Sequence, residues 1–464
     1  MVHSGAPLAR GPSMSPHLAK LWNSLQASLS FRPVLFVTLG ITLGMVLPAL
    51  DQSWPAMGRQ LRGFWLSTYL PTTPDSSRDV LIGMAAALVT VMAVAASMTM
   101  VTVQLASTQY TPRLLARFMA DHGTQRMLGA YLLTVVYLLL LLGVMGTPSE
   151  DPQGTSIPVL SLGVALLLTL FCLVLLPYFL HHAARSVEAS SIIASIGREI
   201  IRELEQLNVD EVLELSTPLP SPAEEEATVI TTRETGYVQL VDYARLLEAL
   251  PRGVHTVRLD VRTGDFLFPG LPLLSLWPQV SLSERQRRRL HAALAVGHTR
   301  TTQQDVLYGV RQLVDMALKA LSPAINDVTT AVMVVNELGA VGRAVAGRGR
   351  LGQGWWMRRC DGVTLLRPGF GLIPFLQDAF GEIPLAAASQ PRVILRIMEV
   401  LAEIASVEQD PAMRVALVQT GRAVYEAARL ANQRERDVRL IEERWSELQK
   451  RATTPSTLPC ETVH

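Results

Sequence analysis

The sequence predicts four transmembrane α-helices followed by a cytoplasmic α+β domain, which has a small β barrel-sandwich-like module and a helical C-terminal part. Hydrophobic residues make up 49% of the 464 residues, only 17% are charged, and the mean hydropathy is positive. The charged residues are concentrated in the second half, whereas apolar runs of transmembrane length precede residue 181. A membrane-embedded first half and a water-exposed second half explain this division.

Four segments in the first half are long and apolar enough to cross the hydrocarbon core, which takes about 20 helical residues. These predicted spans are residues 31–50, 79–108, 126–146 and 157–180, and none has a charged side chain in its interior. Residues 1–30 form a cytoplasmic N-terminal segment. Because that segment has no compact apolar core with a cleavage site, we interpret the first run as a retained span and not as a signal peptide.

The distribution of basic residues between short loops predicts which ends of the spans face the cytoplasm. Basic residues precede the first span, lie between the second and third, and follow the fourth: Arg10, Lys20, Arg32, Arg113, Arg117, Arg126, Arg185, Arg198 and Arg202. The loop TPSEDPQGTS between the third and fourth spans has two acids and no base. Residues 51–78 carry three arginines against this trend. On balance, both termini are expected in the cytoplasm.

Small and polar residues recur along the second predicted span. Gly83, Thr90, Ser97 and Gln104 are spaced every seven residues, and Thr108 follows four later. At about 100° per residue, these positions lie on one stripe of a helix. The stripe has two interpretations: it lines a pore or cavity, or it is a packing surface where small and hydroxyl residues let helices approach closely.

A short amphipathic helix is predicted directly after this span, between Thr111 and Gly123. Its apolar residues fall on one side, while Arg113 and Arg117 lie four residues apart on another. Such a helix suits the lipid boundary. We therefore expect the two arginines to anchor the chain to lipid phosphates.

Residues 181–215 are predicted to form a helical stalk. Ile193, Ile196, Ile200, Leu204 and Leu207 follow a spacing of three and four residues that is typical of an amphipathic helix. The adjacent His181 and His182 would point about 100° apart on a regular helix, so they are not expected to bind one metal ion together. The three cysteines, Cys172, Cys360 and Cys460, are scattered singly and indicate neither a disulfide framework nor a metal site.

The remaining sequence divides at a Pro- and Glu-rich linker, residues 216–228. Residues 229–280 alternate and turn like a small β module, which resembles the barrel-sandwich modules of the biotinyl and lipoyl type. The carrier lysine of those modules is missing, because no lysine occurs between Lys20 and Lys319. The expected role is therefore structural or docking, and residues 281–464 are expected to form a mainly helical cytoplasmic domain.

One group of charged and polar residues in the helical domain is a candidate ligand site. It consists of Asp305, Arg311, Asp315, Asn326 and Asp327. A simpler interpretation accounts for the same residues: Arg311 and Asp315 can pair at i,i+4, while Asn326 and Asp327 can cap the next helix. Such uses of these residue types are general in helical proteins.

Three strings are similar to those of one bacterial family: SMTMVTVQLASTQYTPRLLARF, YFLHHAARS and RTTQQDVLYGVRQLVDMALKALSPAINDVTTA. That family is domain-of-unknown-function family 2254, described as predicted membrane proteins. The resemblance extends from the first span to about residue 340. It implies a multi-pass protein of the bacterial inner (plasma) membrane, and it adds no catalytic residue because the family has no assigned activity.

Two functional hypotheses follow. The first is an oligomeric channel or transport-like protein whose partners are the lipid bilayer and further copies of itself, with a cytoplasmic domain that regulates the pore. The alternative is a membrane-anchored interaction or regulatory protein that binds a cytoplasmic protein. No phosphate-binding loop, dinucleotide fingerprint, zinc-protease motif or serine elbow occurs, so neither catalytic residues nor a cofactor or metal are predicted. The net charge of +1 gives no support to nucleic-acid binding.

Overall fold

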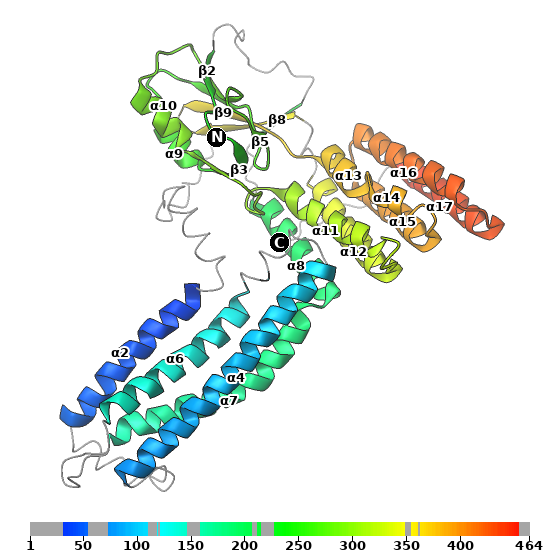
Figure 1. The fold of residues 1–464 in the computed structure, drawn as a ribbon. Helices are drawn as coiled ribbons and strands as arrows, with labels where there is room; N and C mark the ends of the chain where they lie inside the picture. The colour runs from blue at the N-terminus through cyan, green and yellow to red at the C-terminus, as the bar shows by residue number, and fades with distance from the viewer. Residues whose placement is uncertain are drawn as a thin grey trace, which may run out of the picture. The chain divides into compact units, whose positions relative to one another are not determined.

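The computed structural model describes residues 31–53, 73–109, 118, 121–145, 158–206, 211–214, 227–348, 354–360 and 362–453. The described residues up to Glu188 belong to one compact unit, and those from Ala189 onward belong to a second. We call them the membrane unit and the sheet-containing unit. Figure 1 colours both along the chain, and each is considered separately.

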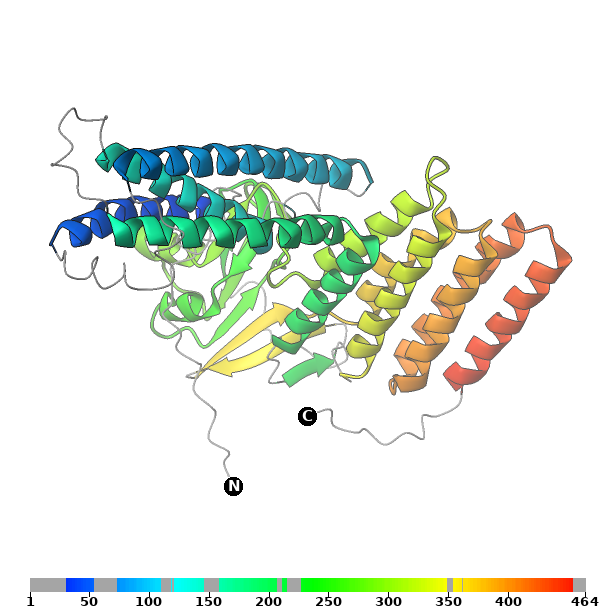
Figure 2. The same cartoon turned by 90° about the horizontal axis from the view of Figure 1, so that it is seen from below.

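The membrane unit consists of long helices that run alongside one another (Figures 1 and 2). They are α2 (Phe31–Ser53), α4 (Pro74–Gln109), α6 (His122–Val144) and α7 (Val159–Ser186). With 36 residues, α4 extends about 54 Å, well beyond the hydrocarbon core of about 30 Å. The structure thus has apolar helices of membrane-spanning length at all four places where the sequence predicts them.

Glycines allow α2 to pack closely against α6. A β-carbon at Gly40 would lie 2.7 Å from the carbonyl oxygen of Leu133, and one at Gly129 would lie 2.7 Å from the Phe36 ring. Two buried tyrosines of α6 then join it to α7, where Tyr131 donates to the Cys172 carbonyl at 2.7 Å and Tyr137 to the Ser161 carbonyl at 2.8 Å. In an apolar bundle, such close contact and internal hydrogen bonding replace the hydrophobic driving force.

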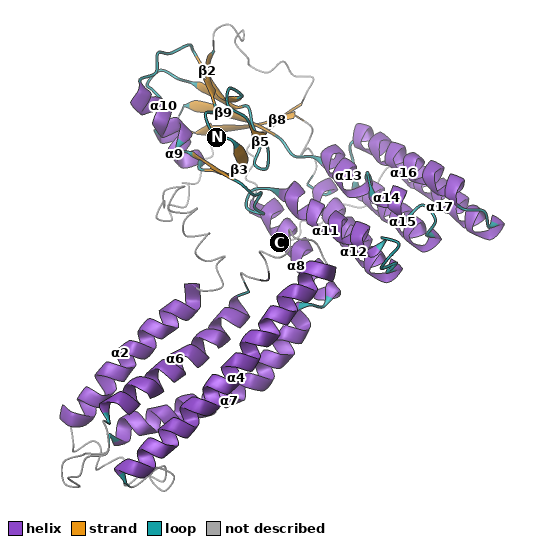
Figure 3. Cartoon of the chain, viewed as in Figure 1, coloured by secondary structure: helices purple, strands orange, loops and turns teal. Residues whose placement is uncertain are grey.

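The strands of the sheet-containing unit form two sheets (Figure 3). The larger has the order β1-β8-β9-β4-β6-β2, with β1 at Glu211–Glu214, β8 at Gly354–Cys360, β9 at Val363–Pro368, β4 at Thr256–Leu259, β6 at Pro272–Trp277 and β2 at Thr228–Thr231. The smaller has the order β5-β3-β7, with β5 at Phe266–Leu267, β3 at Gly236–Val241 and β7 at Leu294–Gly297. Two short helices, α9 (Tyr243–Glu248) and α10 (Glu284–His291), occur between these strands in chain order.

The expectation of a small barrel-sandwich-like module is wrong, because the described strands form open sheets and no closed barrel. The reason is a long-range pairing. Strand β4 pairs in parallel with β9, placing Val257 beside Leu365, and β9 in turn pairs with β8. The larger sheet therefore takes strands from both sides of residues 229–280, which local alternation cannot reveal.

The helices of the second unit lie side by side beyond the sheets (Figures 1 and 2). In chain order they are α8 (Ala189–Gln206), α11 (Val306–Ala320), α12 (Val328–Ala346), α13 (Leu372–Phe380), α14 (Ile383–Ala386), α15 (Pro391–Val407), α16 (Pro411–Ala431) and α17 (Glu435–Thr453). Helix α12 packs against α8, α11 and α15. Its Val334, Val335 and Leu338 are fully buried, so it forms the centre of this helical layer.

The predicted helical stalk of residues 181–215 corresponds only in part to α8, because residues 181–186 continue α7 and Glu211–Glu214 form strand β1; Leu207 lies outside the described residues. The apolar α8 residues Ile193, Ile196, Ile200 and Leu204 are at most 2% exposed. They face helices of their own unit: a β-carbon added at Gly309 of α11 would meet Ile200 at 2.5 Å. This apolar stripe is thus covered within one chain, and a second copy is not needed to bury it.

Candidate functional site

The small and polar stripe lies on the outward face of α4. Gly83, Thr90, Ser97, Gln104 and Thr108 are all exposed, and a β-carbon at Gly83 would meet nothing within 4 Å. The opposite face of α4 supplies the side chains packed inside the membrane unit, namely Leu81, Ala85, Leu88, Ala95 and Ala106. These five residues therefore take no part in helix packing among the described residues of this chain, and the exposed Val94 and Val101 lie between them on the same face.

The hydroxyl groups of the stripe bond partly within the helix. Thr90 donates to the Ala86 carbonyl at 2.9 Å, and Thr108 donates to the carbonyl of Gln104 at 3.2 Å. Such bonds satisfy a hydroxyl in an apolar environment without any neighbouring chain. Among the five stripe residues, Gln104 has the largest polar side chain.

The predicted lipid-anchoring residues Arg113 and Arg117 lie outside the described residues. Just beyond them, Asp121 caps α6, accepting from the backbone nitrogens of Gly123 at 3.2 Å and Thr124 at 2.9 Å. The same carboxylate lies 2.7 Å from Nε2 of His182 on α7, which joins the ends of two apolar helices. Neither residue was singled out from the sequence as one of a pair, although Asp121 precedes a helix start in the manner of an N-cap.

The residues of the candidate ligand cluster do not converge on one site. Asp305 precedes α11, whereas Asn326 and Asp327 follow its last turn, and the 15 residues between these ends span about 22 Å. Asp305 accepts from the Tyr308 backbone nitrogen at 3.0 Å, and Asp327 accepts from that of Thr330 at 3.0 Å. Both aspartates are thus helix caps in the structure.

Asp305 also makes a buried ion pair. Arg300 donates two hydrogen bonds of 2.9 Å to the two carboxylate oxygens, and the Asp305 side chain is 3% exposed. Burial raises the pKa of the Asp305 carboxyl, and the bonds from Arg300 oppose that rise. Because Arg300 remains charged, the pair neutralises itself and leaves no net charge for a ligand.

Arg311 likewise has partners within the protein. It donates to Asp315 at 2.9 Å, and it forms an ion pair with Glu382, the residue that precedes α14. The Glu382 hydrogen bond holds the pKa of the Arg311 guanidinium above its ordinary value, and burial opposes it. Asn326 has a φ of 49° and accepts from Gln390 at 3.2 Å. Structural contacts therefore account for each member of the cluster.

The described residues contain no group of three or more histidine, cysteine, aspartate or glutamate side chains that could hold a metal ion.

Two hydrogen bonds of Gln304, just before α11, are not predictable from the sequence. Glu203 of α8 accepts from the Gln304 backbone nitrogen at 3.2 Å, and the Gln304 side chain accepts from the Val241 backbone nitrogen of β3 at 3.1 Å. These contacts link residues far apart in the chain, so no local pattern marks them.

The apolar helices of one unit and the mixed sheets of the other define the class: a membrane protein with several apolar helices and a sheet-containing domain. Within that class, the chain belongs to the family described as Predicted membrane protein (DUF2254), whose model matches residues 26–403. This confirms the family resemblance seen in the sequence.

Relatives occur in mycobacteria. Uncharacterised proteins of Mycobacterium bovis and Mycobacterium tuberculosis (strain H37Rv) are each 28% identical over 405 residues, which cover 85% of this chain and 74% of theirs. No solved structure matches the chain.

Proposed function

We propose that the protein is a homo-oligomer of the bacterial inner membrane in which α4 faces neighbouring copies and lines a path for ions or small polar solutes. The domain that begins at Ala189 regulates that path from the cytoplasm, where both termini lie. The observation that carries this proposal is the position of the stripe of small and polar residues, on the face of α4 that its own chain leaves uncovered.

The small residues on the exposed face of α4 support association through this helix. The exposed face of α7 bears bulky side chains, including Leu167 at 54%, Phe171 at 53% and Val174 at 71% exposure, as expected for a surface in contact with acyl chains. The exposed face of α4 also bears bulky side chains, such as Val94 at 58% and Met100 at 69% exposure, but Gly83, Thr90 and Ser97 recur among them every seven residues. Small residues allow close approach of helices in a bilayer, and polar groups gain more from a protein or water environment than from lipid.

The number of spans in this proposal is four. Helix α12 is a fifth helix long and apolar enough to cross a membrane. It packs, however, among α8, α11 and α15, and its exposed side includes Asn336 and Arg343. An amphipathic helix with a polar stripe toward water and an apolar face toward other helices is a component of a water-exposed domain.

The proposal is tested by measuring solute flux into liposomes that contain the purified full-length protein. Gln104→Leu and Ser97→Leu should each reduce the flux severalfold, because they replace polar groups of the path with bulky apolar ones. The matched control is Phe171→Leu, a change on the exposed face of α7 that should leave the flux unchanged. Absence of flux for a broad panel of ions and small solutes would contradict the proposal, as would equal effects of all three substitutions.

The alternative remains a membrane-anchored interaction or regulatory protein without transport activity. The internal hydrogen bonds of Thr90 and Thr108 favour it, since these two hydroxyls do not require a water-filled path. In that case the liposomes would show no flux, while a purified cytoplasmic protein would bind the full-length chain with a defined stoichiometry.

A further inference from the structure

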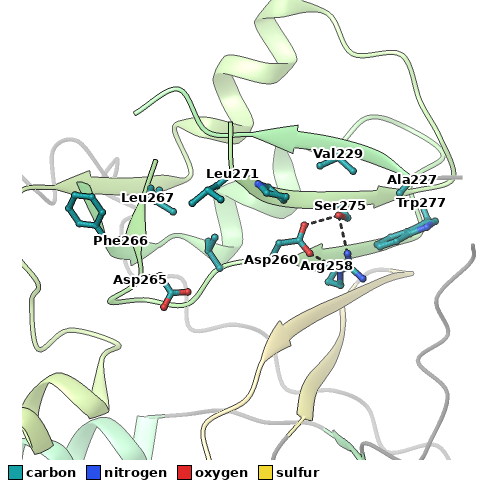
Figure 4. A pocket seen from close by; sticks show the side chains of 12 residues that line it. Ala227, Val229, Arg258, Asp260, Asp265, Phe266, Leu267, Leu271, Ser275 and Trp277 are labelled. Atoms are coloured by element: carbon teal, nitrogen blue, oxygen red, sulfur yellow. Dashed lines mark hydrogen bonds and ion pairs between the residues drawn. The ribbon is translucent and has the colours of Figure 1, made fainter. Parts of the chain in front are cut away.

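An exposed apolar turn joins β5 to β6 in the sheet-containing unit. Its sequence is FLFPGLP, residues 266–272, and it exposes Phe266 at 40%, Phe268 at 58% and Leu271 at 40%. The rings of Phe266 and Phe268 are in edge-to-face contact, with 5.2 Å between their centres. Phe266 and Leu271 also border the cavity drawn in Figure 4, where Val229 of β2 adds a further exposed side chain. We call Phe266, Phe268 and Leu271 the apolar tip.

The apolar tip differs from the other exposed apolar residues of this unit. Among the described residues, those others are dispersed over helices and the connection between α11 and α12, and none is aromatic: Ile325, Met333, Leu385, Val415, Leu430 and Leu440. Single exposed apolar side chains are normal on a surface in water, whereas a contiguous group marks a contact with protein or membrane. The apolar tip is such a group, because its three side chains occur within six residues.

The backbone of this turn has no unpaired amide donor between residues 269 and 272. The Leu271 nitrogen donates to the Phe268 carbonyl at 3.1 Å, which closes a turn in which Gly270 has a φ of 94°. The Gly270 nitrogen donates to the Thr232 carbonyl at 2.9 Å, and the other two residues are prolines, which have no N–H. Backbone donors that are already paired are the condition for entering an environment without water.

A basic cluster lies beside the apolar tip. Arg233 directly follows the Thr232 that holds the turn, and its guanidinium lies 3.6 Å from the carboxylate of Glu284 at the start of α10. Helix α10 carries the arginines of the run ERQRRR, and its eight residues extend only about 12 Å. Residues 233–234, 265–272 and 283–291 together contain five arginines and three acids, so positive charge is in excess around the apolar tip.

The charge and the apolar side chains together select the partner. Apolar groups that enter the boundary between headgroups and acyl chains, with arginines beside them, are the features by which proteins bind the surface of an anionic bilayer. The paired backbone donors of the turn favour lipid, which cannot supply acceptors, over a protein partner, which can. A bilayer is also within reach, because only two residues separate the end of α7 at Ser186 from the start of α8 at Ala189.

We propose that the apolar tip and the arginines of α10 form a surface that docks on the anionic phospholipids of the membrane that holds the chain. The phenylalanines and Leu271 enter the boundary between headgroups and acyl chains, and the arginines contact lipid phosphates. The sheet-containing unit is thereby held at the bilayer by a second contact besides its covalent connection to α7. This surface does not depend on whether α4 forms a path for solutes.

The test measures contact between the apolar tip and lipid in the full-length protein without its native cysteines. Phe268→Cys and, separately, Leu271→Cys are labelled with the fluorophore bimane, and the protein is reconstituted in vesicles of equal parts phosphatidylcholine and phosphatidylglycerol. Lipids with a nitroxide near the headgroup end of the acyl chain should quench both labels severalfold. The matched control is Leu430→Cys on α16, an apolar position that is 90% exposed, where the label should not be quenched.

A second comparison tests the role of charge. Vesicles of phosphatidylcholine alone should reduce the quenching at Phe268→Cys severalfold, as should the combined change Arg285→Gln, Arg288→Gln and Arg289→Gln at exposed positions, which should leave the melting temperature unchanged. The proposal is overturned if the labels at Phe268→Cys and Leu430→Cys are quenched equally, or if phosphatidylglycerol makes no difference. A shift of the emission to shorter wavelength without quenching also overturns it, because protein would then cover the apolar tip.

Discussion

At the scale of single residues, carboxylates secure the helix starts of both units, in two different ways. Asp121 and Asp327 cap the helices that they directly precede. Asp51 belongs to the last turn of α2, yet it accepts from the backbone nitrogens of Leu160 at 3.1 Å and Ser161 at 2.9 Å, at the start of α7. The residue before α7 is Pro158, whose side chain offers no cap. Asp51 therefore satisfies backbone donors that would otherwise be unpaired.

Asp51→Ala should destabilise the membrane unit, because it removes the acceptor for two backbone donors and for the Ser161 hydroxyl at 2.6 Å. The loss of a helix cap costs about 1 kcal/mol, and more where water cannot replace it. The measurement is the melting temperature of the protein in detergent. The melting temperature of Asp51→Asn, which keeps one acceptor oxygen, should lie between those of the wild type and Asp51→Ala. A melting temperature of Asp51→Ala equal to that of the wild type contradicts this role.

The Asp327 cap gives a prediction about pH. Hydrogen bonds from the side chain and backbone of Thr330 lower the pKa of the Asp327 carboxyl below its ordinary value of 3.8. The carboxylate therefore contributes stability above that pH, and the contribution is lost as the pH falls through the lowered pKa. Because an asparagine side chain cannot titrate, the difference in melting temperature between the wild type and Asp327→Asn should be constant from pH 7 to 5 and shrink below pH 4. A difference that does not change with pH contradicts the prediction.

The sequence alone predicts some of these residue contacts and not others. Asp327 is recognisable because it stands directly before an apolar, helix-forming segment. Asp51 is not, since its contact with α7 joins residues separated by 109 positions. The same limit applies to the apolar tip: the contacts of its turn with Thr232, and of Arg233 with Glu284, join segments that are far apart in the sequence.

At the scale of elements, α12 is the helix for which length and hydropathy leave open whether it spans the membrane. It has 19 residues and passes the same criteria as the helices of the membrane unit. Its Glu337 and Arg343 would be costly in lipid, whereas its buried valines fit between neighbouring helices. The sequence predicts a mainly helical domain over residues 281–464, in which Asn326 and Asp327 can cap the helix that follows them. The larger sheet, in contrast, pairs strands that are far apart in the sequence, so local sequence patterns do not predict it.

Labelling with a membrane-impermeant maleimide tests the assignment of α12. In a chain with Cys172→Ala, Cys360→Ser and Cys460→Ser, a cysteine introduced by Ala340→Cys should react when inside-out membrane vesicles are treated. Val174→Cys, an exposed position near the middle of α7, should remain unreactive in vesicles of either orientation because lipid surrounds it. An unreactive Ala340→Cys in both orientations, with reaction after detergent is added, would identify α12 as a span.

At the scale of the whole molecule, the chain combines a membrane unit with a larger sheet-containing unit whose helical layer extends past the region that the family model matches. That match ends at residue 403, inside α15. Helices α16 and α17 lie beyond it, and α17 packs against α15 through contacts that include the ion pair of Arg444 with Glu399 at 3.1 Å. Composition and hydropathy were sufficient to predict the two-part organisation, whereas the association of several copies is a proposal that depends on α4.

Disulfide cross-linking tests this association. In the same cysteine-free chain, Ser97→Cys on the exposed face of α4 should give a covalent dimer in native membranes after mild oxidation, because equivalent α4 faces meet in the oligomer. Val174→Cys on α7 is the control and should remain monomeric. Equal cross-linking at both positions, or none at Ser97→Cys with oxidants of different sizes, contradicts an α4 interface.

The contact between Asp51 and α7 has a consequence for biogenesis. The ribosome produces α2 first and α7 last among the long apolar helices of the membrane unit. The backbone donors at the start of α7 are therefore synthesised more than 100 residues after Asp51. During that interval the first inserted segment ends in an uncompensated negative charge, which favours its staying at the aqueous boundary or in the shelter of the translocation machinery. Only the completed fourth helix supplies the missing donors, so this contact closes the membrane unit at the end of its synthesis.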